Sequence, residues 1–387
     1  MSGQTQGPGL LLIENGEVLT PEPCGRTPVL LAGTKIARIG PVDPRGAEAL
    51  GLDLDVIDAR GCWVTPGLVD PHAHLTGGSG EEGFASRTPS IQLSELIRGG
   101  TTTVVGCLGV DATTRTLIDL LACVNGLDEQ GISAFMYTGS YDIPPVTLTG
   151  GVREDLLIVD KVVGVGEVAI SDERAPQPTV RDLARVVIDA KVGGMLSGKA
   201  GVTHFHLGSQ PEKMAPLRAL IDEYHIDPAL LYPAHVHRNE ALIEEAVDLS
   251  RRGSYVDMDA IEEELGRCIR LFLEKGGDLR RLTLSSDADS NAPEELWRKL
   301  RQAVRGGMAF ERLLPAVTAN AARVLKLAGK GRLAPGCDAD VLVVRKDSLE
   351  IVHVIAKGRH LVRDGKIVEK EEFLAESKRS LVLQGEA

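Results

Sequence analysis

The stretch Val64-Thr65-Pro66-Gly67-Leu68-Val69-Asp70-Pro71-His72-Ala73-His74 decides how the rest of the chain is interpreted. It is an apolar run that ends in two histidines separated by one residue, and it predicts one short strand. Side chains at positions i and i+2 of a strand point to the same face of the sheet. We therefore expect His72 and His74 to reach one metal ion from the same side.

The composition is that of an ordinary globular protein. The chain has 387 residues, of which 43% are hydrophobic and 25% are charged. This length suits one large barrel with a smaller accessory unit. The formal net charge of -12 gives no electrostatic footprint for nucleic acid or for an anionic membrane, so neither is expected as a partner.

The cysteines and the first residues favour the cytoplasm. The six cysteines are scattered and form no C-x-x-C pair, which is typical of reduced thiols rather than of a disulfide framework or a zinc ribbon. The first residues lack a basic region, and the apolar run at 10–13 is too short for a signal core or a membrane span.

Both ends of the chain read as short strands. Strand candidates lie at 10–13, 17–19, 29–31 and 35–39, and again at 341–344, 351–355 and 361–362. Neither set can bury much apolar surface alone. We therefore expect residues 1–64 and 329–387 to form one small β-sandwich domain.

Residues 65–328 have a different pattern. Short apolar runs alternate with amphipathic stretches that predict helices at 90–98, 116–130, 180–192, 240–252 and 261–275. Alternation of this kind indicates parallel β/α units, and the length fits a (β/α)8 TIM-type barrel. The predicted fold class is thus α/β, a barrel flanked by a sandwich built from both termini.

Histidines and carboxylates recur where the apolar runs of the barrel end. Such barrels carry their active sites at the C-terminal ends of the strands. The residues in question are His72, His74, Glu167, His204, His206, His235, His237 and Asp287. Spacing does not choose between His204 and His206, or between His235 and His237. This mixture favours zinc or another borderline divalent ion, with enough ligands for two.

At this point the sequence resembles the amidohydrolase superfamily. The motif from Pro66 to His74, the pair Ser286-Asp287 and the stretch Gly336-Cys337-Asp338-Ala339-Asp340 carry the likeness. Within the superfamily it is most similar to isoaspartyl (β-aspartyl) dipeptidases, through Gly77-Gly78-Ser79-Gly80-Glu81, Thr138-Gly139-Ser140-Tyr141 and Ala169-Ile170-Ser171-Asp172, among others. The resemblance implies a zinc metallopeptidase, a homo-oligomer, that hydrolyses the isopeptide bond of β-aspartyl dipeptides with a metal-bridging hydroxide.

The resemblance also implies a role for each matching residue. His72, His74 and Asp287 would hold one zinc ion, and His206 and His235 the other. Asp287 would accept the proton of the hydroxide and return it to the leaving amine. The implied substrate contacts are Tyr141 to the oxyanion, Glu81 to the α-amine, Arg174 and Arg238 to the carboxylates, and further contacts from the backbone of Ser79 and Gly80 and from Ser290.

The chain departs from the family pattern at three places. The family usually bridges its metals with a carboxylated lysine, whereas this chain has Glu167, after one extra residue, as a direct carboxylate substitute. Some amidohydrolases with a glutamate here use one metal, so one or two ions are possible. Val110 stands where the family has a threonine. Asp289 adds a negative charge in the stretch after Asp287, where Asn291 is the alternative to Ser290.

Two other functions are weighed. One is an amidohydrolase of another specificity, such as a cyclic-imide hydrolase or an N-acyl deacetylase, which Glu167 and Val110 leave open. The other is a non-catalytic scaffold that acts through oligomer contacts. Metal analysis separates the scaffold from the enzymes, because scaffolds on enzyme folds tend to lose their ligands.

Overall fold

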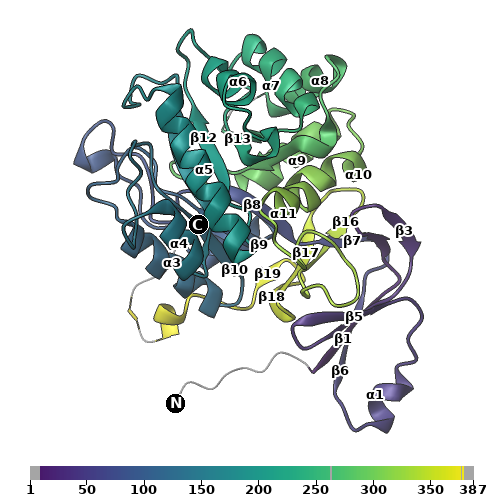
Figure 1. Cartoon of the computed structure of the whole chain (residues 1–387). Helices are drawn as coiled ribbons and strands as arrows, with labels where there is room; N and C mark the ends of the chain where they lie inside the picture. Colours follow the sequence, from purple (N-terminus) through teal and green to yellow (C-terminus); the bar gives the residue numbers. More distant parts are fainter. Residues whose placement is uncertain (1–8, 262–263, 376, 379–387) are drawn as a thin grey trace.

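A curled parallel sheet lies at the centre of the molecule (Figure 1). The computed structural model describes residues 9–261, 264–375 and 377–378. Six parallel strands form the order β13-β12-β11-β10-β9-β8, and β14 pairs in parallel with β15. Their bounds are β8 Leu68–Ala73, β9 Thr101–Gly106, β10 Ser133–Thr138, β11 Val162–Ile170, β12 Val202–Leu207, β13 Leu231–Pro233, β14 Val256–Asp259 and β15 Leu282–Ser285.

Backbone hydrogen bonds join the two sheets at both of their edges. The N–H of Val236, just after β13, donates to the carbonyl oxygen of Asp257 in β14. At the other edge the N–H of Asp287 donates to His72 and the N–H of His74 donates to Ala288, at 3.0 and 2.9 Å. The strands therefore continue around toward a closed ring, which brings the ends of β8 and β15 together.

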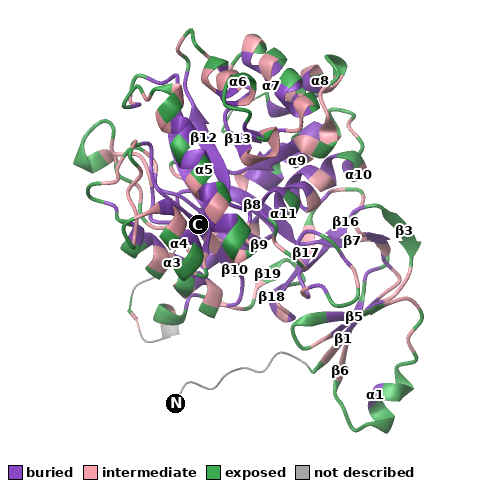
Figure 2. Ribbon diagram, in the orientation of Figure 1, coloured by how far each residue is buried: buried purple, intermediate pink, exposed green. Residues whose placement is uncertain are grey.

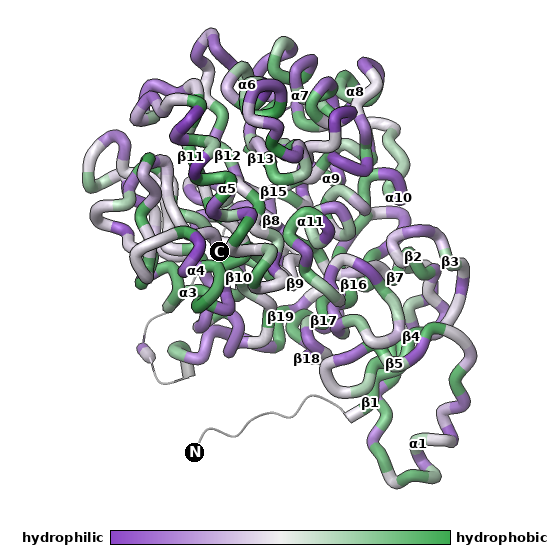
Figure 3. Tube along the Cα trace, viewed as in Figure 1, coloured by the Kyte–Doolittle hydropathy of each residue, from purple (hydrophilic) through white to green (hydrophobic). Residues whose placement is uncertain are grey.

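A helix follows each of these strands. They are α2 Leu93–Arg98, α3 Leu117–Glu129, α4 Val152–Ile158, α5 Val180–Ser197, α6 Ala215–Asp222, α7 Glu240–Arg252, α8 Leu265–Glu274 and α9 Glu295–Arg305. Shorter helices are α1 Arg45–Ala49, α10 Phe310–Leu313 and α11 Ala319–Val324, and 3-10 turns lie at Phe84–Ser86, Pro228–Leu230, Leu279–Arg281, Leu314–Val317 and Glu372–Ala375. Helices α6 to α8 alternate polar and apolar residues along their turns (Figure 3), as one-sided burial requires.

Capping residues and glycines near the ends of helices explain which predicted helix ends are right and which are wrong. The helix predicted at 240–252 is confirmed as α7. It begins after Asn239, whose side chain accepts a hydrogen bond from the N–H of Leu242, and it ends at Gly253, which has a left-handed backbone conformation. The helix predicted at 180–192 continues to Ser197. Gly193 and Gly194 do not stop it, because they pack closely: a Cβ on Gly194 would lie 2.6 Å from the backbone of Gly201.

The stretch from Val64 to His74, predicted as one strand, belongs to two strands. β7 (Cys62–Pro66) pairs with β16 (Val341–Arg345) in an accessory sheet, whereas β8 belongs to the central sheet. The chain changes sheets at Gly67, where a Cβ would lie 2.1 Å from the hydroxyl oxygen of Thr102. A residue without a side chain is therefore needed at the crossing, and periodicity does not reveal that crossing.

The accessory sheets combine both ends of the chain. One has the order β19-β18-β17-β16-β7-β2-β3 and the other β5-β4-β1-β6. The remaining bounds are β1 Leu10–Glu14, β2 Glu17–Leu19, β3 Pro23–Arg26, β4 Val29–Ala32, β5 Lys35–Ile39, β6 Leu54–Asp58, β17 Ile351–Ala356, β18 Arg359–Arg363 and β19 Lys366–Ile367. β3 was not predicted, because Pro21 and Gly25 were interpreted as turn residues between strands. The predicted strands at 17–19 and 35–39 are confirmed.

Two buried clusters hold these layers. The larger one lies between the central strands and their helices, and the central strands are buried along their lengths (Figure 2). The smaller one joins side chains of both accessory sheets, such as Leu31 of β4 and Val343 of β16. Among the described residues, every helix is too short or too polar to cross a membrane.

Candidate active site

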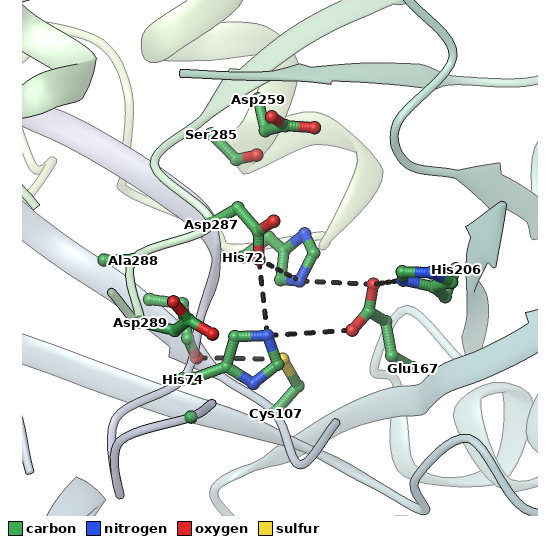
Figure 4. Close-up of polar contacts among 12 residues, drawn as sticks. His72, His74, Cys107, Glu167, His206, Asp259, Ser285, Asp287, Ala288 and Asp289 are labelled. Carbon is green, nitrogen blue, oxygen red and sulfur yellow. Dashed lines mark hydrogen bonds and ion pairs between the residues drawn. The ribbon is translucent and has the colours of Figure 1, made fainter. Parts of the chain in front are cut away.

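The C-terminal ends of the central strands bring a set of imidazoles and carboxylates together (Figure 4). The structure places His72 in β8 and His74 just beyond it, with His235 after β13 and Asp287 after β15. Glu167 and His206 were predicted at strand ends, but they lie inside β11 and β12 because both strands run on beyond them. All six side chains are buried.

One group forms around Asp287. Nε2 of His72 and Nε2 of His74 lie 3.2 and 3.3 Å from the same carboxylate oxygen of Asp287. Nε2 of His72 is also 3.4 Å from Oε1 of Glu167, and Nε2 of His74 is 3.8 Å from Oε2. The i and i+2 histidines therefore do face one point, as the sequence pattern predicted.

Glu167 also belongs to a second group. Its Oε1 lies 3.0 Å from Nδ1 of His206 and 3.1 Å from Nε2 of His235. Glu167 thus stands between two pairs of histidines: its Oε1 lies near His72, His206 and His235, and its Oε2 lies near His74. This is the place that a bridging carboxylate between two metal ions would occupy.

Two aspartates orient the histidines of this second group. Oδ2 of Asp259, at the end of β14, is 2.6 Å from Nδ1 of His235, and Oδ2 of Asp172 is 3.1 Å from Nε2 of His206. A carboxylate behind the imidazole fixes its tautomer and leaves the other nitrogen for a metal. Sequence reasoning missed Asp259, because Asp257 interrupts the apolar run before it. Burial lowers the pKa of His235, but Asp259 outweighs it and raises that pKa to about 9.

Within the part of the chain that the structure describes, neither alternative histidine belongs to a group of side chains that could hold a metal ion, although the ring of His204 lies edge-on to that of His72, with ring centres 4.6 Å apart. His204 stacks on Tyr137 with ring centres 5.0 Å apart, and its Nδ1 lies 3.0 Å from the carbonyl oxygen of Tyr232. Burial is the main reason that its pKa falls well below the ordinary value, so His204 stays neutral. His237 lies behind Asp259, with its Nε2 at 3.7 Å.

A bulge in β11 turns Glu167 toward the site. Val165 pairs with Thr203 and Val168 with Phe205, so β11 has one residue more than β12 between these pairs. A Cβ on Gly166 would lie 2.7 Å from the carbonyl oxygen of His204. The inserted glycine therefore lets the two backbones approach at the point where the carboxylate leaves the strand.

The electrostatics of the cluster favour a bound cation. Burial would lower the pKa of His72, but Glu167 and Asp287 hold it well above the ordinary value. Burial would raise the pKa of Glu167, but His72 and His206 hold it well below. Neither ring nitrogen of His72 nor Oε2 of Glu167 makes a hydrogen bond. Buried polar atoms without partners and a donor set of imidazoles and carboxylates fit a divalent metal.

Three of the predicted substrate contacts lie beside the cluster. The hydroxyl oxygen of Tyr141 is 2.7 Å from Nδ1 of His206. Burial raises the pKa of Tyr141 well above 10, and Glu167 adds to this, so the phenol stays protonated. Arg174 lies 2.6 Å from Glu81 and 2.8 Å from Asp172. Its contact with Asp172 is the main reason that the pKa of this guanidinium is raised.

A small pocket opens from His74 toward the loop that follows β8. It is lined by Gly77, Gly78, Ser79, Glu81, Gly109, Val110, Asp111, Arg115, Tyr141 and Asp289. Asp289 accepts from the backbone N–H of Ser79 at 3.1 Å, so this N–H, expected to face substrate, has a partner in the protein. Gly80 lies beside Ser79 with a positive φ of 93°.

The last two predicted contacts lie farther out. Arg238 donates to the carbonyl oxygen of Leu207 at 2.7 Å and is half-buried, and its positive charge opposes part of the rise in the pKa of Tyr141. Ser290 is exposed on the loop after β15. The structure thus brings the six candidate ligands together with Tyr141, Arg174 and Glu81, and leaves Ser290 at the surface.

The chain belongs to the amidohydrolase family, whose model matches residues 63–368. The fold of that family is a TIM-type barrel, which agrees with the curled parallel sheet and its surrounding helices; the barrel prediction is confirmed. More particularly, the chain is similar to a beta-aspartyl dipeptidase from Fervidobacterium islandicum, a thermophilic keratin-degrading organism, with 40% identity and a TM-score of 0.88. That likeness covers 92% of this chain and 98% of the other.

The chain is also similar to two further proteins or complexes. A structure of the Fervidobacterium enzyme in complex with the beta-Asp-Leu dipeptide shares 39% identity, with a TM-score of 0.87, over 93% of this chain and 98% of that one. An adenine deaminase of Latilactobacillus sakei is 24% identical over 95% of this chain. The chain spans only 60% of the length of that deaminase.

Proposed function

We propose that this protein hydrolyses the isopeptide bond of β-aspartyl dipeptides. The observation that carries the proposal is the 40% identity over nearly the whole length of a beta-aspartyl dipeptidase. The arrangement of Tyr141, Arg174 and Glu81 beside the histidine–carboxylate cluster supports it. A β-aspartyl dipeptide carries an ammonium group and two carboxylates, which match one acidic and two basic side chains.

We further propose that the cofactor is zinc, with two ions in each subunit. His72, His74 and Asp287 would hold one, His206 and His235 the other, and Glu167 would contact both. The position of Glu167 between the two histidine pairs supports two ions rather than one. Zinc, when bound, polarises the scissile carbonyl and makes water a nucleophile at neutral pH.

Asp287 is the proposed proton carrier. It is buried and close to His72 and His74, and these histidines keep the pKa of its carboxyl below the ordinary value although burial would raise it. A carboxylate held ionised in this place can accept a proton from the attacking water and deliver it to the leaving amine. Tyr141, kept protonated, donates a hydrogen bond to the oxygen where negative charge develops.

Charge pairs bind the rest of the dipeptide. Glu81 and Arg174 pair with each other at 2.6 Å, and a substrate with both signs of charge can insert between them without leaving either unpaired. Arg238 and the backbone of Ser79 and Gly80 complete the proposed contacts, with Ser290 at the mouth. In this scheme the backbone N–H of Ser79 gives up its hydrogen bond to Asp289 and donates to the substrate instead.

The domain boundaries and assembly belong to the same proposal. Residues 1–64 and 329–387 would form a β-sandwich beside the barrel at 65–328, which the cluster shared by the two accessory sheets supports. A cytoplasmic homo-oligomer accounts for the free cysteines and for exposed apolar side chains on two neighbouring helices, α4 and α5, namely Leu157, Ile158, Ile188, Met195 and Leu196. Light scattering of the purified protein measures the assembly.

One experiment tests the activity. The purified protein is assayed for metal content, for release of aspartate from β-Asp-Leu, α-Asp-Leu and an N-acyl aspartate, and for ring opening of a cyclic imide. We expect bound zinc and rapid cleavage of β-Asp-Leu alone, abolished by a chelator and restored by zinc. Survival of β-Asp-Leu while the N-acyl or cyclic substrate is cleaved would assign the site to another amidohydrolase reaction.

A further inference from the structure

A buried cysteine lies against the histidines of the cluster. Cys107 follows β9, and its backbone N–H donates to the carbonyl oxygen of Ala73 at 3.0 Å. This bond ties it to the segment between His72 and His74. Its Sγ lies 3.7 Å from Nδ1 of His74 and 3.7 Å from the carbonyl oxygen of Ala73 (Figure 4). The side chain is fully buried, so the thiol faces the site and not solvent.

Unpartnered polar atoms surround the same point. One donor atom from each of His72, His74, Cys107 and Glu167 lies within 4.8 Å of the other three. Both ring nitrogens of His72 and Oε2 of Glu167 lack hydrogen bonds although these side chains are fully buried. Ligand atoms around a tetrahedral zinc ion stand about 3.4–3.8 Å apart, given bonds of about 2.0–2.3 Å. Small side-chain movements would therefore bring all four onto one ion.

We propose that the thiolate of Cys107 is a ligand of the metal ion held by His72 and His74. This inference rests on the metal centre of the proposed function and adds a sulfur donor to it. On binding, the S–H bond breaks, a sulfur–metal bond forms, and the proton passes to solvent. Glu167 is shorter than a carboxylated lysine. A thiolate beside it would add negative charge and fill a further coordination position on the metal ion.

The competing role for Cys107 is to orient His74. In that arrangement Sγ accepts a hydrogen bond from Nδ1–H of His74 and leaves Nε2 free to face the cluster. The thiol then stays protonated and donates to the carbonyl oxygen of Ala73. The two roles differ in one observable respect, because only the first places sulfur in direct contact with the metal.

Cobalt substitution distinguishes them without any substrate. The purified protein is stripped of metal and reloaded with Co²⁺, and the near-ultraviolet spectrum is recorded for the wild type, Cys107→Ser, Cys107→Ala and the matched control Cys62→Ala, which alters a buried cysteine in the accessory cluster. We expect thiolate-to-cobalt charge-transfer absorption in the wild type and the control, and none in either Cys107 variant. Metal affinity should fall about tenfold or more in both variants.

The proposal would be overturned if the wild type bound at least one cobalt ion for each chain and showed no charge-transfer absorption. It would also be overturned if the absorption persisted in Cys107→Ala. X-ray absorption of the zinc-loaded wild type needs no variant and so covers the case in which the variants do not fold. A sulfur neighbour at about 2.3 Å from zinc is expected, and a shell of nitrogen and oxygen alone would contradict it. Because neither readout depends on turnover, failure to cleave β-Asp-Leu would count against the activity only.

Discussion

At the scale of single residues, Glu167 is the side chain on which both histidine pairs depend. Replacement by glutamine keeps its size and removes the charge that faces His72 and His206. We expect Glu167→Gln to lose at least one metal ion and to lower kcat/KM for β-Asp-Leu about 100-fold or more, since the ligand set is broken. Elemental analysis and steady-state kinetics measure the two effects.

The matched control is Glu173→Gln, which alters an exposed carboxylate on the nearby loop and should leave both values unchanged. Added bicarbonate should not affect the wild type, because a glutamate needs no carbon dioxide to become a carboxylate. Activity that rises with bicarbonate would show that a carboxylated lysine is used instead.

Glu81 and its neighbour Glu82 offer a second matched comparison. Both side chains are exposed, but Glu81 pairs with Arg174 and lines the pocket beside the cluster. A hydrogen bond to a charged group is worth about 1.5–3 kcal/mol, so Glu81→Gln should lower kcat/KM for β-Asp-Leu about 10- to 100-fold, with metal content retained. Equal losses in Glu81→Gln and Glu82→Gln would remove Glu81 from substrate binding.

The sequence predicted the positions of those site residues that recur at a regular spacing. His72 and His74 were expected to face one point because they are two apart on a strand, and the structure shows that they do. Cys107 was missed because a cysteine does not stand out inside the apolar run 104–108, and Asp259 because Asp257 interrupts the run before it. Which of His204 and His206 faces Glu167 depends on the bulge in β11, and a bulge is a property of the pairing between strands.

At the scale of elements, the bulge in β11 is the feature that aims Glu167. Gly166→Ala would place a methyl group 2.7 Å from the carbonyl oxygen of His204. We expect this to destabilise the fold by about 1–3 kcal/mol, as overpacking does, and to lower zinc content by displacing Glu167. Denaturant unfolding and elemental analysis provide the measurements.

The control for that substitution is Gly126→Ala in α3, where an added Cβ meets nothing within 4 Å. Alanine is favoured over glycine inside a helix by about 0.5–1 kcal/mol, so this variant should be as stable as the wild type or slightly more so. A Gly166→Ala protein with full zinc and unchanged stability would show that the bulge is not required.

At the scale of the whole molecule, metal and folding should be coupled. The ligands come from strands spread between residues 68 and 287, and only the folded chain assembles them. A ligand present at about a hundred times its dissociation constant stabilises the folded state by about 2.7 kcal/mol. Chelation should therefore lower Tm by several degrees in calorimetry, and zinc should restore it. An unchanged Tm after verified metal removal would contradict this coupling.

The change of sheet at Gly67 also bears on how the protein is made. β7 is held by β16, and β7 leads through one residue into the strand that carries His72. While the chain is still on the ribosome, residues 62–66 can pair with β2 on one side, but their other side has no strand neighbour until residues 341–345 have emerged. The strand that leads into the first strand of the barrel should thus be held from one side only until late in synthesis.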